Sequence, residues 1–233
     1  MLIREDPLFS LIPLFALVNL GALIFLLFLC RHFIMAFLRE IDRTTYFFLL
    51  GIFSAALVIR LVVPPIQHIM YIDEAWYMEA AKNFVQHGHP GEYPKPIGWP
   101  LILSFFFRIF GISNWVALYT MIVFGALTAF SVFFLAFAIL RDSRTALFAA
   151  LMISLSPVHI RWSATAETNI IALFMACLSL SVSFLYYRNK SQFLLWLSMA
   201  AIAFTAQFRF ENYLFFPLFL FPILHHRKRD NNV

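Results

Sequence analysis

Two adjacent carboxylates, Asp73 and Glu74, open the most polar stretch of a sequence that is otherwise largely apolar. A carboxylate beside a membrane can act as a general base that takes a proton from a hydroxyl group. The pair could equally be structural, because Asp73 suits the N-cap of a helix and Glu74 suits the positive end of the helix dipole. Taken alone, the two residues favour the cap, and the catalytic interpretation stays open.

The segment after the acidic pair has the periodicity of an amphipathic helix. Trp76, Ala80 and Phe84 recur at intervals of four residues, with Tyr77 and Ala81 beside them. Trp and Tyr prefer the level of the lipid headgroups. We therefore predict an interfacial helix that carries the two carboxylates in its first turn.

Seven further polar side chains end apolar runs or lie in short polar stretches: Arg60, Lys95, His159, Arg161, Glu167, Arg209 and Glu211. With the topology predicted below, they share one membrane face with the acidic pair. Arginine and lysine can hold a phosphate, and apolar helices can hold a lipid tail. Cations and carboxylates at the ends of apolar helices therefore indicate a site for a phosphate that carries a long lipid.

Each of these residues also has a simpler explanation. Arg60 and Lys95 could extend toward the interface, although a charge inside a membrane span is a functional candidate by default. The segment broken at Pro157 could be an ordinary outer loop, although short segments broken by proline often mark binding sites. Arg209 and Glu211 are two positions apart, so we do not expect them to pair within one helix.

Metal ligands and disulfides are not indicated. His87 and His89 lie near Glu92, but the ligand set is incomplete and the spacing is unspecific. The two cysteines, Cys30 and Cys177, belong to apolar runs, which supports neither a disulfide framework nor a zinc site. We assign no metal ligands and no certain cofactor, and a divalent metal ion stays open.

The composition defines the class of protein. Of 233 residues, 62% are hydrophobic and 12% are charged, which is too apolar for a soluble domain. We predict an all-α, polytopic transmembrane helical bundle of about seven spans, with an amphipathic outer-face loop after the second span. We expect Trp99–Gly111 to lie at the interface. The predicted spans are Leu8–Cys30, Thr44–Val63, Asn114–Leu140, the short Thr145–Ser156, Thr168–Tyr187, Gln192–Phe208 and Asn212–Leu224.

The basic residues set the predicted orientation. The net charge of +5 does not indicate nucleic-acid binding, because these residues occur singly or in pairs between apolar runs. With the Arg31–Arg43 connection in the cytoplasm, ten of the 17 basic residues fall on the cytoplasmic side. We therefore expect an integral, multi-pass plasma membrane protein with a cytoplasmic C-terminus and the acidic loop outside. The seven on the other side are Arg4, Arg60, Lys82, Lys95, Arg108, Arg161 and Arg209.

Between Arg60 and Pro217, an arginine near the end of a span precedes "DEAWY", an alanine-rich helix, "KPIGWP" and "FFFRIFG". This order resembles the first outer loop of the GT-C glycosyltransferases, which include protein O-mannosyltransferases and lipid A aminoarabinose transferases. "SPVHIRWSATAET" is similar to a later outer turn of that family.

The resemblance implies transfer of a sugar from a polyprenyl-phosphate carrier to a hydroxyl acceptor on a protein, lipid or glycan. It agrees with the absence of a glycine-rich nucleotide-binding loop. Asp73 matches the family's catalytic base and Glu74 matches the residue beside it. Lys95 matches the lysine before the proline, and Arg161 and Glu167 match the second turn.

The chain also departs from the family's pattern. Residues 1–43 add a membrane helix and a cytoplasmic loop before a GT-C-like module at residues 44–233, and family members are usually far longer. We therefore weigh a non-catalytic membrane subunit or scaffold of a split enzyme, with a partner chain that supplies the missing helices. A transporter of lipid-linked substrates fits less well, because it needs charges near the middle of the membrane.

Overall fold

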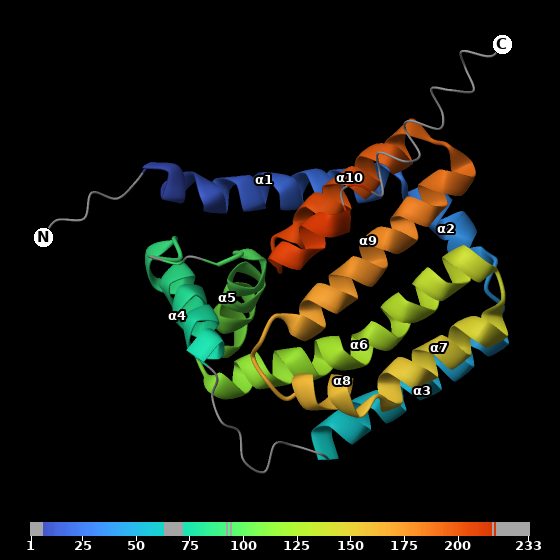
Figure 1. The fold of residues 1–233 in the computed structure, drawn as a ribbon, viewed down its shortest axis with the longest axis horizontal. Helices are drawn as coiled ribbons and strands as arrows, with labels where there is room; N and C mark the ends of the chain where they lie inside the picture. Colours follow the sequence, from blue (N-terminus) through green and yellow to red (C-terminus); the bar gives the residue numbers. More distant parts are fainter. Residues whose placement is uncertain (1–6, 63–71, 92, 94, 216, 218–233) are drawn as a thin grey trace, which may run out of the picture.

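The computed structural model describes residues 7–62, 72–91, 93, 95–215 and 217, and this part of the chain consists of helices joined by turns and loops, without strands (Figure 1). The helices are α1 (Pro7–Leu29), α2 (Arg31–Arg39), α3 (Arg43–Val62), α4 (Ile72–His87), α5 (Gly98–Phe110), α6 (Asn114–Leu140), α7 (Ser143–Leu155), α8 (Pro157–Trp162), α9 (Asn169–Asn189), α10 (Gln192–Ala206) and the 3-10 helix η1 (Phe210–Phe215).

The prediction of an all-helical membrane bundle is confirmed, but seven spans are not. Within the described residues, α3, α6 and α9 are long and apolar enough to cross a membrane. Residues 14–29 of α1 and helix α2 form a fourth candidate, bent by 60° where a charged connection was expected. Helices α5, α7 and α10 are apolar but shorter. The predicted span Asn212–Leu224 begins in η1 and then leaves the described residues.

Helix α6 forms the centre of the bundle and packs against α3, α5, α7 and α9, while α10 packs between α9 and α1 (Figure 1). The small side chains Ala117, Ala126 and Ala129 are fully or almost fully buried on α6 and let neighbouring helices approach closely. The apolar core of the described residues has one cluster around Trp99, a second around Phe133 and a small third one of Ala16, Phe84 and Ile97.

One end of the bundle, here called the connection end, holds the links between α2 and α3, α6 and α7, and α9 and α10 (Figure 1). Arg141 forms an ion pair with Glu40, and its guanidinium lies over the rings of Phe37 and Phe137. The contact ties the link that follows α2 to the link that follows α6. Basic residues expected in the cytoplasm therefore gather at this end.

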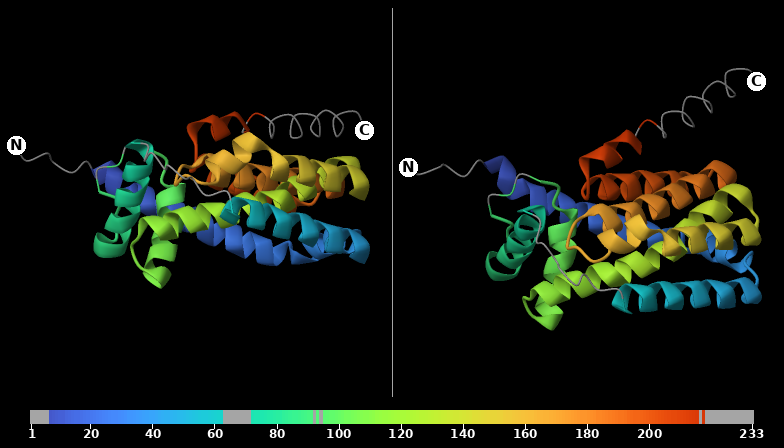
Figure 2. Two further views of the ribbon diagram at one scale, coloured as in Figure 1. Left: turned by 90° about the horizontal axis from the view of Figure 1, so that it is seen from below. Right: turned by 60° about the horizontal axis from the view of Figure 1, so that its bottom comes forward.

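The opposite end, here called the site end, holds α4, α5, α8 and the turn formed by residues 163–168 (Figures 1 and 2). The backbone N–H of Gly98 donates to the carbonyl of Gln207 over 2.7 Å, which joins the start of α5 to the end of α10. A Cβ atom at Gly98 would lie 2.8 Å from that carbonyl oxygen. The glycine of "KPIGWP" is thus required by a close approach of two backbones.

Candidate functional site

The adjacent carboxylates lie in different environments. Helix α4 begins at Ile72, so Asp73 lies inside the first turn and not at the N-cap. The side chain of Asp73 is 47% exposed and forms an ion pair with the ammonium of Lys95. Glu74 has no exposed surface, and its Oε1 accepts the backbone N–H of Ala166 over 2.7 Å. One carboxylate is therefore accessible, whereas the other joins α4 to the turn 163–168.

The buried face of α4 is rotated from the predicted one. Tyr77, Ala80, Ala81 and Phe84 are buried as expected, but Trp76 is 45% exposed. Glu74 lies on the buried face in place of Trp76, because residues three and seven positions apart share a helix face. The indole of Trp76 instead lies near the ammonium of Lys95, 5.0 Å from ring centroid to Nζ.

Lys95 is held between the acidic pair and two aromatic rings. Its side chain is 20% exposed, and its Nζ lies 5.4 Å from the centroid of Tyr77 as well as near Trp76. Cation–π contacts of this kind help to hold an ammonium without neutralising it. The ammonium of Lys95 thus lies between the carboxylate of Asp73 and two aromatic rings.

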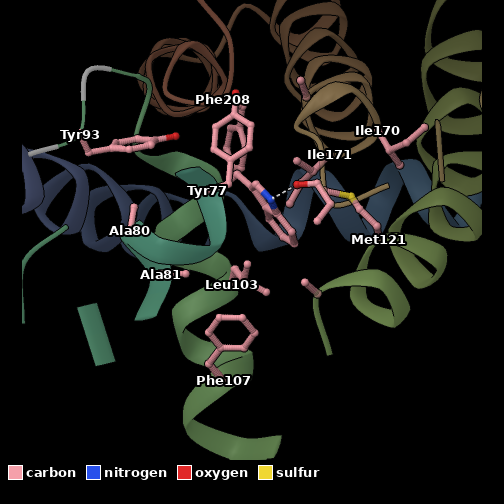
Figure 3. Packing of buried hydrophobic residues seen from close by; sticks show 14 of the residues in the cluster. Tyr77, Ala80, Ala81, Tyr93, Leu103, Phe107, Met121, Ile170, Ile171 and Phe208 are labelled. Carbon is pink, nitrogen blue, oxygen red and sulfur yellow. Dashed lines mark hydrogen bonds between the residues drawn. The ribbon is translucent and has the colours of Figure 1, made fainter. Parts of the chain in front are cut away.

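Trp99 completes the link to the turn 163–168. Its side chain is fully buried, and its Nε1–H donates to the carbonyl oxygen of Ala166 over 2.8 Å, the bond dashed in Figure 3. Both backbone groups of Ala166 are thus used, one by α4 and one by α5. Further along the turn, the Oγ1 atom of Thr168 lies 3.5 Å from the hydroxyl of Tyr77.

Glu167 lies close enough to Asp73, Glu74, Lys95 and Arg209 for their charges to change its pKa. Burial raises the pKa of this half-buried carboxyl, and the carboxylates of Asp73 and Glu74 raise it further. The cations Lys95 and Arg209 act in the opposite direction. The structure therefore brings residues from α4, the loop before α5, the turn 163–168 and the segment after α10 into one cluster.

Tyr93 is a residue of this cluster that the sequence reasoning missed. It is 8% exposed, packs on Tyr77 with ring centroids 6.0 Å apart, and its hydroxyl has no hydrogen-bond partner among the described residues (Figure 3). Burial raises its pKa, and the charges of Tyr77, Asp73 and Glu167 act in the same sense. Its hydroxyl therefore stays protonated and can donate. The available signal was its position two residues before Lys95.

Arg60 and His159 form a second, buried cluster. Arg60 is 1% exposed and lies in the last turn of α3. One of its terminal nitrogens lies 2.6 Å from Nδ1 of His159, which is itself buried. Burial, with the nearby charge of Arg60, lowers the pKa of His159 to about 4. Both residues lie at the site end and face the protein interior.

Arg209 and Glu211 do pair, against the sequence-based expectation. Nε and Nη2 of Arg209 donate to the two carboxylate oxygens of Glu211 over 3.1 and 2.7 Å, and Nη1 donates to Asn169. The helix argument does not apply, because Arg209 lies just before η1 and outside α10. The hydrogen bonds from Arg209 lower the pKa of Glu211 to about 2.

Arg161, His87 and His89 have fewer contacts than the residues above. Arg161 is exposed on α8, and its side chain has no hydrogen bond or ion pair within the described chain, although its backbone carbonyl accepts the N–H of Ala164. His87 and His89 lie with ring centroids 6.0 Å apart, while Glu92 falls outside the described residues. Where the structure is described, no three His, Cys, Asp or Glu residues are arranged to hold a metal ion.

The fold and the site define an all-helical membrane protein with charged side chains gathered at one end of the bundle. Residues 94–232 match the family model of the dolichyl-phosphate-mannose-protein mannosyltransferases, so more than half of the chain is covered and the chain belongs to this family. The match includes Lys95 and the turn 163–168, whereas Asp73 and Glu74 precede it.

One relative is an uncharacterized protein of Aquifex aeolicus (strain VF5), which is 29% identical over 137 residues. The aligned part is 55% of this chain but 28% of that protein, so the chain spans less than a third of its relative's length. No solved structure matches the chain.

Proposed function

We propose that the protein is a membrane glycosyltransferase, or the catalytic portion of one, that transfers a sugar from a polyprenyl-phosphate carrier to a hydroxyl acceptor. The observation that carries the proposal is the pair of Asp73 and Lys95, an accessible base beside a cation under apolar helices. Family membership supports the reaction class. The donor, the acceptor and the site residues are part of the proposal.

The different environments of the two carboxylates assign their roles. A general base must reach the proton that it removes, and Asp73 is the accessible carboxylate. It takes the proton of the acceptor hydroxyl as that oxygen attacks the anomeric carbon. The bond between this carbon and the phosphate oxygen breaks, and its electron pair leaves with the lipid phosphate. Glu74 holds the turn 163–168 in place, and a single displacement inverts the anomeric configuration.

The leaving lipid phosphate gains negative charge, which a nearby cation stabilises. Lys95 is the cation closest to the proposed base, and two aromatic rings hold its ammonium. Arg161 and Arg209 supply further positive charge at the site end and are the proposed contacts for the rest of the donor.

The proposed membrane is the plasma membrane, with the site end outside and the connection end in the cytoplasm. The Lys/Arg bias supports this orientation, because cytoplasmic loops are enriched in these residues. The clustering of Arg141 with the links at the connection end agrees with it. The carrier lipid would lie along the apolar helices next to the site end, among ordinary membrane lipids.

The test is sugar transfer from polyprenyl-phosphate sugars to hydroxyl acceptors with purified wild-type protein and the Asp73→Asn variant. We expect the substitution to lower the rate by about 100-fold or more, the usual contribution of a general base. Glu79→Gln is the matched control, because Glu79 is an exposed carboxylate of the same helix, paired with Lys82. An active wild type with a fully active Asp73→Asn variant would show that the base is another group.

A second candidate is a membrane subunit of a split enzyme, whose partner chain supplies further helices; the part aligned with the relative is 28% of that protein. In this case the isolated chain would bind the lipid-linked sugar without transferring it. A co-purifying membrane partner would then restore transfer. Stable folding without any binding of the lipid-linked sugar would instead indicate a scaffold.

A further inference from the structure

The buried cluster around Arg60 ends in the same turn that holds the acidic pair. The guanidinium of Arg60 donates from Nε to Oγ of Ser163 over 3.1 Å. Its Nη1 donates to the carbonyls of Ala56 and Ser154 over 3.0 and 3.2 Å, and its Nη2 lies 2.6 Å from His159. Every nitrogen of the guanidinium therefore contacts a protein group, and the side chain is 1% exposed.

The contact with Arg60 fixes the tautomer of His159. A guanidinium only donates, so Nδ1 of His159 must accept and its proton must reside on Nε2. The carbonyl of His159 in turn accepts the hydroxyl of Ser163 over 2.7 Å. Arg60, His159 and Ser163 thus bond to one another at the junction of α8 and the turn 163–168, while the buried Nε2 of His159 has no hydrogen-bond partner among the described residues.

Helix α6 packs against Ser163 and Arg60 at Gly125. A Cβ atom at Gly125 would lie 2.3 Å from Oγ of Ser163 and 3.1 Å from Nε of Arg60. The absence of a side chain at Gly125 is therefore what allows Ser163 and the guanidinium to lie against α6. The start of the turn is clamped between α3, α6 and α8.

The clamped turn leads directly to the site. Ala166 follows Ser163 by three residues, a distance of at most about 10 Å along the chain. Its N–H binds Glu74 over 2.7 Å and its carbonyl binds Trp99 over 2.8 Å. A shift of Ser163 is therefore passed to α4, which carries Asp73 beside Glu74.

We propose that Arg60 is a positioning residue of the site: with His159 and Ser163 it fixes the turn 163–168, which orients the acidic pair of α4. Sequence reasoning assigns Arg60 to substrate binding, a role that its burial and its protein contacts do not support. A charge buried in a membrane span is costly, and its use here is to hold a turn. The kinetic part of this inference rests on the proposed function, whereas its structural part does not.

The test compares Arg60→Met, Ser163→Ala and the wild type in two measurements. Transfer kinetics should show kcat lowered by about 10- to 100-fold in Arg60→Met, because small misplacements of catalytic groups are costly. KM for the lipid-linked sugar should stay within about threefold, because Arg60 does not touch the substrate. Hydrogen exchange of a peptide that covers residues 163–168 should become at least about tenfold faster. Ser163→Ala should change kcat and exchange in the same direction by smaller factors.

Val158→Ala is the control, since Val158 is an exposed side chain of α8 that contributes to neither cluster. It should leave both measurements unchanged. A raised KM with unchanged kcat in Arg60→Met would mean that Arg60 binds the donor, and would overturn the proposal. Unchanged exchange at residues 163–168 would also overturn it, even if no transfer activity is found. If Arg60→Met does not fold, the Ser163→Ala variant provides the test. Exchange at residues 163–168 as slow as in the wild type would then show that Ser163 does not fix this turn.

Discussion

At the scale of residues, the acidic pair shows that two consecutive carboxylates of one helix can lie in different environments. Consecutive side chains on a helix point in directions about 100° apart. Asp73 consequently reaches Lys95 and solvent, while Glu74 points into the bundle. The sequence alone could not assign these environments, because the partner of Glu74 is the backbone of Ala166, 92 positions away.

The buried role of Glu74 leads to a stability prediction. Glu74→Ala would leave the N–H of Ala166 buried without this acceptor, which costs about 1–3 kcal/mol of unfolding free energy. Glu74→Gln should cost less, because its amide oxygen can still accept. Denaturant unfolding in detergent, followed by circular dichroism, measures both effects. Glu79→Ala on the exposed face is the control, and a Glu74→Ala variant as stable as wild type would contradict the assignment.

The lowered pKa of His159 predicts a dependence of stability on pH. In the unfolded chain its pKa is near 6.5, whereas burial lowers it to about 4 in the folded protein. The unfolded state therefore binds the proton first, and stability falls as the pH drops from about 6.5 to about 4. The loss is roughly 3 kcal/mol at most.

The measurement is the unfolding free energy at several pH values for wild type and His159→Asn. Asparagine offers Arg60 an acceptor oxygen but does not titrate, so its curve should be flatter between pH 4 and 6.5. The exposed histidines contribute equally to both curves. Parallel curves would show that His159 does not carry this dependence.

At the scale of elements, the helical class was predictable and the number of spans was not. Long apolar runs suffice to recognise α3, α6 and α9. Helices α5, α7 and α10 are shorter than the roughly 20 residues that a span needs. Periodicity also misplaced the buried face of α4, because Glu74 is buried for its contact with a distant turn. The number of spans and the buried face of α4 both depend on contacts between segments far apart in the chain.

The junction of α5 with α10 makes a prediction about Gly98. Alanine at this position would place its Cβ 2.8 Å from the carbonyl oxygen of Gln207, a backbone atom that cannot move away alone. We expect Gly98→Ala to lower stability by about 1–3 kcal/mol through this overpacking. Gly51→Ala is the matched control in α3, where no atom lies within 4 Å of the added Cβ.

The control should leave stability unchanged or raise it by up to about 1 kcal/mol, since alanine is the better helix former. Thermal unfolding of both variants in detergent provides the comparison. Equal effects of the two substitutions would mean that helix propensity, and not the junction between α5 and α10, determines the response at Gly98.

At the scale of the whole molecule, the bundle separates its charges by end. Asp73, Lys95, Glu167 and Arg209 meet at the site end, although the sequence distributes them over more than 130 positions. The sequence predicts that these four residues share one side of the membrane, because consecutive spans cross it in opposite directions and the Lys/Arg bias sets which side is cytoplasmic. Their separation from the buried cluster of Arg60 could not be predicted, since only the packing of α3 against α6 and α7 creates it.

The separation of ends predicts how the protein lies in its membrane. Glu79 has a side chain 59% exposed at the site end, and Asn189 is exposed at the connection end. Single cysteines at these positions would be introduced after the buried Cys30 and Cys177 are replaced by alanine. Neither change adds or removes a basic residue, so the Lys/Arg bias that sets the orientation is preserved.

We expect a membrane-impermeant maleimide to label Glu79→Cys in intact cells and to reach Asn189→Cys only after the membrane is permeabilised. The reverse pattern would place the site end in the cytoplasm, where the acidic pair would face acceptors of that compartment. Equal labelling of both positions in intact cells would contradict a bundle that crosses the membrane between its two ends. The assay thus tests the orientation without any assumption about the sugar or the acceptor.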